Sequence, residues 1–180
     1  MRAVIVYESM YGNTHLIADA IAAGLGDNEV AVVPVEHATD ELVAGADLLV
    51  VGGPTHAHGM TRASTRQAAV DAAHKPKSEI ALDPDAEGEG LREWFEQLGA
   101  VAGTAAAFDT RADAPAAFTG RASKGIAKRL RHHGLVLLAE PESFLVIRDN
   151  HLEPHEEERA RTWGAVLADA MNTALGAPRS

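Results

Sequence analysis

The sequence contains no cysteine, which excludes disulfides, thiolate metal sites, iron–sulfur clusters and a cysteine nucleophile. It also has no apolar stretch long enough to cross a bilayer. The charged residue Glu8 interrupts the first apolar run too early for a signal peptide. We therefore expect a cytoplasmic protein with no membrane partner.

Basic residues are scarce. The chain has 16 Lys and Arg against 26 Asp and Glu, and the net charge of −10 argues against nucleic acid as a partner. Of its 180 residues, 46% are hydrophobic, enough for the core of one domain. We expect a single domain over residues 1–176. Residues 75–90 change in composition and predict a surface excursion, which covers the functional site or joins a subunit contact in a homodimer.

A strand, a loop and a helix open the chain. The run Val4–Val6 predicts a strand, and helical periodicity starts at about Asn13. The first N–H groups of this helix point back into the loop, where they and the helix dipole favour an anion. No Lys or Arg lies between Arg2 and Arg62, so hydroxyl and backbone donors would have to hold a phosphate here, with His15 the only possible cation.

The loop reads Ser9-Met10-Tyr11-Gly12-Asn13-Thr14. It resembles the phosphate-binding loop of flavodoxins and of the related FMN-dependent quinone reductases. That family holds the phosphate of flavin mononucleotide (FMN) without a basic side chain, so the resemblance implies an FMN cofactor bound by these six residues. A Walker loop would need a lysine after its last glycine, and a dinucleotide fingerprint would need three spaced glycines; neither is present.

Strands alternate with helices along the chain, which predicts an α/β fold with a doubly wound parallel sheet and helices on both faces. Leu48–Gly52 is apolar without alternation, as in a strand covered on both faces. Pro34 cannot donate to a ladder and predicts that the second strand lies at an edge. This agrees with the five-stranded order 2-1-3-4-5 that the resemblance implies. The last strand is expected in two parts around Pro141.

The segment Gly53–Gly59 follows the third strand, and its Gly and Pro predict a rigid turn rather than more strand. In flavodoxins the matching loop passes along the flavin ring. The resemblance therefore makes cofactor contacts of Pro54, Thr55, His56, His58 and Gly59. A solvent-facing turn with incidental histidines is the alternative. A metal site would need a further ligand, and we predict none.

Asp109, Thr110 and Arg111 follow the expected fourth strand, Val101–Phe108, and are predicted to open a third loop beside the cofactor. In flavodoxins this loop often carries a tyrosine next to the ring, but here the nearest aromatic is Phe118. Arg111 could meet the flavin, meet an acidic substrate or pair with a neighbouring aspartate.

Two helices allow more than one interpretation. Trp94 has the spacing of a core residue, although it could also neighbour a flavin. The helix predicted over Ser123–His133 is basic. Cations near a helix C-terminus suit the dipole, so a solvated face is the default, and an acidic partner is the alternative.

Two functions are compatible with these motifs. In the first, an FMN-binding protein acts in electron transfer or flavin-dependent reduction, with a redox partner protein or a quinone-like acceptor. In the second, the fold serves as a binding or regulatory module with a weakened or lost flavin site. We assign no catalytic residue. No nicotinamide site is legible, so carrier and NAD(P)H:quinone reductase-like enzyme both stay open.

Overall fold

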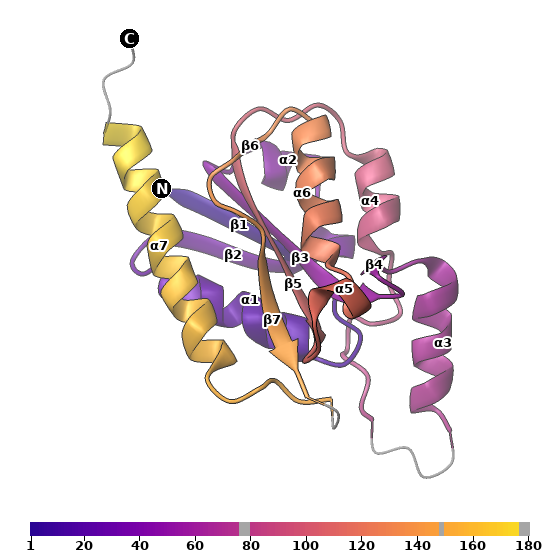
Figure 1. Cartoon of the computed structure of the whole chain (residues 1–180). Coiled ribbons are helices and arrows are strands. Elements are labelled where there is room, and N and C mark those ends of the chain that lie inside the picture. The colour runs from indigo at the N-terminus through magenta and orange to yellow at the C-terminus, as the bar shows by residue number, and fades with distance from the viewer. Residues whose placement is uncertain (76–79, 148–149, 177–180) are drawn as a thin grey trace.

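The computed structural model describes residues 1–75, 80–147 and 150–176. A seven-stranded sheet is flanked by helices on both faces (Figure 1). The strands are β1 (Arg2–Tyr7), β2 (Glu29–Pro34), β3 (Leu48–His56), β4 (Gly59–Met60), β5 (Thr104–Ala112), β6 (Val136–Leu137) and β7 (Glu142–Val146). The helices are α1 (Asn13–Gly24), the 3-10 turn η1 (Val35–His37), α2 (Asp40–Ala44), α3 (Ala63–Ala73), α4 (Leu91–Gln97), α5 (Ala116–Thr119), α6 (Ala122–His132) and α7 (Glu156–Gly176). Across these described ranges, no helix is long and apolar enough to cross a bilayer.

The sheet has the expected order. Strands run β2-β1-β3-β5, and both β6 and β7 pair with β5 in parallel. The fifth strand is therefore split around Pro141 as predicted, and β2 lies at the edge, as Pro34 indicated. The flavodoxin-like prediction is confirmed, with β4 as an addition.

Helices α1 and α7 cover one face of the sheet, and α2, α4 and α6 cover the other (Figure 1). Trp94 is 5% exposed in the core between the sheet and helices α2, α4 and α6, and its indole N–H donates to the carbonyl of Ala38 at 3.1 Å. Its prediction as a core residue is confirmed. Helices α1 and α7 approach closely, since a Cβ on Gly164 would lie 2.3 Å from the carbonyl oxygen of Ile21.

The prediction of a turn over Gly53–Gly59 is wrong. Strand β3 continues to His56 and folds back into β4, pairing Thr55 with Met60. Pro54 is tolerated because the β1 ladder ends at Tyr7 and Gly52, and the missing N–H of Pro54 would face that vacated side. The two residues at the hairpin tip, Ala57 and His58, have φ values of 46° and 70°, the positive pair typical of a type I′ turn.

The loop that was predicted to begin at Asp109 is also part of a strand. Residues Asp109–Arg111 lie within β5, which begins at Thr104 rather than Val101 and runs to Ala112. Pairing with β7, from Phe108 opposite Glu142 to Ala112 opposite Val146, extends the strand beyond the length that composition suggested.

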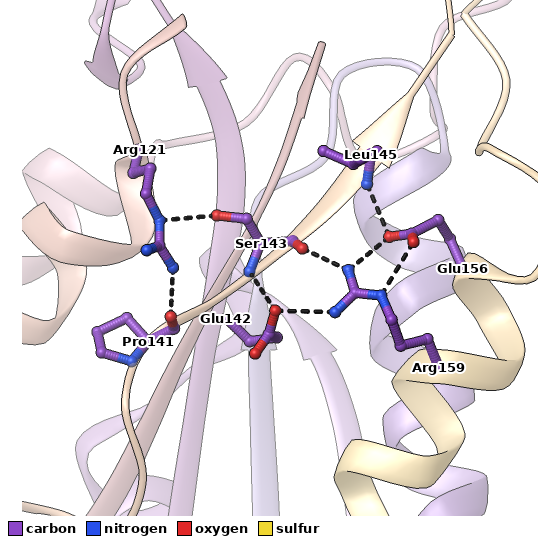
Figure 2. Close-up of polar contacts among 7 residues, drawn as sticks. All are labelled: Arg121, Pro141, Glu142, Ser143, Leu145, Glu156 and Arg159. Atoms are coloured by element: carbon purple, nitrogen blue, oxygen red, sulfur yellow. Dashed lines mark hydrogen bonds and ion pairs between the residues drawn. The ribbon is translucent and has the colours of Figure 1, made fainter. Parts of the chain in front are cut away.

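A polar network anchors β7 (Figure 2). Arg159 donates to both carboxylate oxygens of Glu156, at 2.9 and 2.6 Å, and to Glu142 at 2.8 Å. Glu156 in turn accepts from the backbone N–H of Leu145 at 2.8 Å. The guanidinium also lies 4.4 Å from the ring centre of Phe144. The start of α7 therefore fixes the strand whose end reaches the candidate site.

Part of the 75–90 excursion falls on residues 76–79, which lie outside the described residues. The remainder packs on the first loop. The Asp83 N–H donates to the Met10 carbonyl at 2.9 Å, and Ala86 clusters with Met10 and with Ala69 of α3. These contacts hold α3 and the excursion against one end of the sheet (Figure 1).

Glu8 joins three segments from a buried position. Its carboxylate accepts from the Leu91 N–H at 2.9 Å, at the start of α4, and from the Thr61 hydroxyl after β4. Burial raises the pKa of Glu8, and the hydrogen bonds from Thr61 and Leu91 only partly oppose this. The folded state thus prefers the protonated acid. That contribution to stability is complete below the ordinary pKa of 4.5 and is lost as pH rises through the folded-state value.

We expect Glu8→Gln to flatten the fall in unfolding free energy as pH rises from 4.5, because glutamine keeps both partners without titrating. Glu8→Ala should instead cost about 1–3 kcal/mol, since it leaves the buried Leu91 N–H without an acceptor. Denaturant unfolding across this pH range measures both effects. Parallel pH curves for wild type and Glu8→Gln would contradict the expectation.

Candidate functional site

A cavity of about 600 Å³ opens where β1, β3, β5 and β7 end. This volume is in the range of small-molecule and cofactor sites. The residues predicted from sequence that line it are Ser9, Met10, Tyr11, Asn13, Thr14, Pro54, Thr55, His56, Thr110 and Arg111. Segments from three separate strands therefore converge on one space, as expected for parallel strands that end at the same edge.

Gly12 is the one residue of the predicted loop that does not line the cavity, but it sets the shape of the loop. Its φ of 89° is in the left-handed region that favours glycine, and its N–H donates to the Ser9 hydroxyl at 3.1 Å. It is also the N-cap of α1, yet no side chain caps that helix. The first helical hydrogen bond runs from the Leu16 N–H to the Gly12 carbonyl, so the N–H groups of residues 13–15 have no intrahelical acceptor.

Buried polar side chains tie this loop to the other segments. The hydroxyls of Thr14 and Thr110 lie 2.7 Å apart, and both residues are at most 4% exposed. Only one of the two protons is used between them, so the pair keeps a donor for a ligand. The Asn13 amide donates to the carbonyl of Asn150 at 3.0 Å and so ties the loop to the segment before α7.

Arg111 is the only Lys or Arg among the described residues that line the cavity. It forms no ion pair with Asp109 or Asp113, the alternative that the sequence left open. Its Nη1 donates to the Ala114 carbonyl at 2.6 Å, whereas its buried Nε finds no acceptor in the described part of the chain. Asp109, predicted as a cofactor contact, does not line the cavity; it is buried and accepts from the Ser123 N–H at 2.7 Å, which caps α6.

The two histidines of the hairpin, His56 and His58, line different cavities. His56 is half-buried and lines the cavity, and burial lowers its pKa, so the imidazole is neutral at neutral pH. His58 is exposed at the hairpin tip and, with Gly59, lines a different cavity. The hairpin thus presents one histidine, rather than two, to the site.

A second group of polar residues lies beside the loop. His15, expected as its only possible cation, has Nδ1 3.4 Å from a carboxylate oxygen of buried Asp83, and its ring stacks on Tyr7 at 4.4 Å. The Tyr7 hydroxyl donates to Asp85 at 2.9 Å; burial and then this bond raise the tyrosine pKa. Ligand atoms of His15, Asp83 and Asp85 lie within 4.8 Å of one another, a spacing that a divalent cation could bridge. Their existing contacts already hold the excursion on α1.

Sequence reasoning missed several residues that line the cavity: Ala112, Asp113, Ala114, Val146, Ile147 and Asn150. Val146 and Ile147 could have been found, because the last strand was expected to end at this edge of the sheet. No sequence signal identified Asn150. Phe118 was named as the nearest aromatic to the third segment, but it is 75% exposed and does not line the cavity.

The structure is similar to solved flavodoxins. An archaeal flavodoxin is 19% identical, with 96% of this chain and 99% of that chain covered and a TM-score of 0.65. Oxidised flavodoxin 2 from Bacillus cereus is 24% identical, with 97% and 99% covered and a TM-score of 0.61. Rubredoxin oxygen:oxidoreductase from Desulfovibrio gigas is 20% identical over 98% of this chain but only 37% of that chain, with a TM-score of 0.59. At these identities the likeness shows the fold.

The family assignment comes from the sequence. No curated protein gives a significant match. The family profile described as Flavodoxin, however, matches residues 5–163, a span that holds the first loop, both histidines of the hairpin and the β5–β7 edge. The chain belongs to the flavodoxin family.

Proposed function

We propose that the protein binds FMN in the cavity at the ends of β1, β3, β5 and β7, and that it acts in electron transfer or flavin-dependent reduction. The observation that carries this proposal is the uncapped N-terminus of α1, which meets buried hydroxyl and amide groups where no Lys or Arg of the loop is available. Such a site suits a phosphate.

The cavity offers matching groups for the rest of the cofactor. Tyr11 and His56 supply flat side chains, and the unpartnered Nε of Arg111 supplies a donor that a flavin oxygen would satisfy. Thr55 accepts from the Ala122 N–H at 2.8 Å, which fixes the β3 end beside α6. Bound flavin would supply the electron-transfer chemistry, while these residues position it and set its surroundings. These groups favour a flavin site over a module that has lost one.

A redox partner protein or a quinone-like acceptor would complete the reaction. Carrier and reductase differ in one measurement. The flavin-loaded protein is mixed anaerobically with NADH or NADPH, and the flavin absorption band is followed. Bleaching without a second protein identifies a reductase, whereas an unchanged band that bleaches only with a separate reductase identifies a carrier.

Thr14→Ala should weaken FMN binding by about 1–3 kcal/mol, the cost of losing a hydrogen bond to a charged group. Riboflavin lacks the phosphate, so its weaker binding should hardly change. Fluorescence titration of both flavins measures the difference. Thr173→Ala is the matched control, because Thr173 is exposed on α7 and its hydroxyl donates to the Asp169 carbonyl at 2.9 Å, away from the cavity. Equal affinities of the wild type for FMN and riboflavin would contradict the phosphate site.

His56→Phe and His58→Phe should behave differently. Protonation of His56 would place a positive charge at the cavity, favour anionic reduced flavin and raise the midpoint potential as pH falls. Because burial lowers the pKa of His56, this rise should lie on the acid side of 6.5. Redox titration from about pH 5 to 8 should show it in wild type and His58→Phe and a reduced rise in His56→Phe. Three coincident curves would show that His56 does not influence the flavin.

A further inference from the structure

A second cavity, of about 510 Å³, lies between the β3–β4 hairpin, α4 and α6. Both helices cover the same face of the sheet (Figure 1). We call it the basic groove. Its lining is His58, Gly59, Met60, Arg92, Arg121, Gly125, Lys128, Arg129 and His132. No Asp or Glu is among these described residues, although acids outnumber bases by ten in the whole chain.

The helix dipole explains only part of this charge. Arg129 and His132 lie in the last turn of α6, where cations suit the carbonyl end. Arg92 comes from α4, Arg121 precedes α6, and His58 is at the hairpin tip. Arginines from α4, from the residue before α6 and from α6 itself therefore converge on one space, which a solvated helix face does not require.

Two guanidinium groups are held in place without being neutralised. Arg92 donates to the carbonyls of Met60 and Thr61 at 3.0 and 2.7 Å. Arg121 donates to the Ser143 hydroxyl at 2.9 Å and to the Pro141 carbonyl (Figure 2). All these acceptors are uncharged, so both groups keep their full positive charge in a fixed position.

The remaining cations are free to adjust. Lys128 is exposed and Arg129 half-exposed, and neither forms an ion pair with any described residue. Gly59 and Gly125 also line the groove, and a Cβ on either would make only ordinary van der Waals contact there, 3.9 Å from the Arg92 guanidinium and 3.5 Å from Met60. Fixed and adjustable cations around an open space suit an anion larger than a single carboxylate.

We propose that the basic groove binds a small polyanion with two adjacent phosphate groups, either free or as the diphosphate of a nucleotide. Planar guanidinium groups can bind phosphate oxygens bidentately, and the lysine adds a mobile point charge. The site is separate from the flavin cavity. The hairpin that divides them contributes His56 to one and His58 to the other. The proposal does not depend on FMN binding.

Calorimetric titration with inorganic pyrophosphate and with ADP, at low salt, tests the proposal. The Lys128→Gln/Arg129→Gln double variant should bind at least about tenfold more weakly than wild type, because it removes two charge-assisted contacts. The control is Lys124→Gln/Arg131→Gln, which removes the same charge from exposed positions of the same helix outside the groove. It should stay within about twofold of wild type, since distant exposed charges are screened.

Two further comparisons show which cavity binds pyrophosphate and whether the ligand is a free polyanion or a nucleotide. The phosphate site of the flavin cavity can also take pyrophosphate, so the titrations are carried out with FMN saturating; under this condition Thr14→Ala, which alters only the flavin cavity, should leave pyrophosphate binding in the basic groove unchanged. Tighter binding of ADP than of pyrophosphate identifies a nucleotide, and equal binding identifies a free polyanion; both support the proposal. It is overturned if neither ligand binds at millimolar concentration, if both double variants lose affinity equally, or if only Thr14→Ala loses it.

Discussion

The candidate site depends on which groups accept hydrogen bonds from the free backbone N–H groups at the start of α1. A helix leaves its first N–H groups without acceptors, and most helices supply a capping side chain. Here Gly12 takes the cap position with a positive φ and offers none. The Gly12 N–H instead donates to the Ser9 hydroxyl. The next residues, Asn13 and Thr14, line the cavity, and their N–H groups have no acceptor within the helix. The local geometry thus gives up a stabilising cap and retains an anion site.

The surroundings of that helix end are consistent with an anion that needs no cationic side chain. His15, the nearest candidate, is engaged by Asp83 and stacked on Tyr7. Arg111 reaches the cavity from β5, two strands away from β1 in the sheet, and its shortest hydrogen bond is to the Ala114 backbone carbonyl. Free basic charge is gathered on the other side of the β3–β4 hairpin instead. The β3–β4 hairpin therefore lies between the flavin cavity, which has one basic side chain, and the strongly basic groove.

Features set by neighbouring residues could be predicted from the sequence. The β1–α1 junction, the edge position indicated by Pro34 and the burial of Trp94 each follow from local composition or periodicity, and the structure agrees. The loop residues Ser9–Thr14 were identified in the same way, and Figure 1 shows where β1 leads into α1. The strand order followed from the family resemblance, with Pro34 as independent support.

Features set by pairing between distant segments could not be predicted. Composition suggested a turn at Gly53–Gly59, but hairpin pairing carries β3 through it. The extension of β5 to Ala112 depends on β7, which lies some 30 residues further along the chain. Asn150 meets Asn13 across 137 residues, and Asp83 meets His15 only because the excursion folds back. Within the candidate site, sequence therefore identified the residues at the strand ends more reliably than the segments that close over them.

The central claim is that the N–H groups at the start of α1 bind the flavin phosphate. Amide proton and nitrogen NMR spectra of the protein, recorded without ligand and with FMN, riboflavin or phosphate, test it directly. The account predicts that the amide protons of Asn13, Thr14 and His15 move downfield with FMN, move the same way to a smaller extent with phosphate, and hardly move with riboflavin. Equal shifts with FMN and riboflavin, or FMN shifts confined to other parts of the chain, would contradict it.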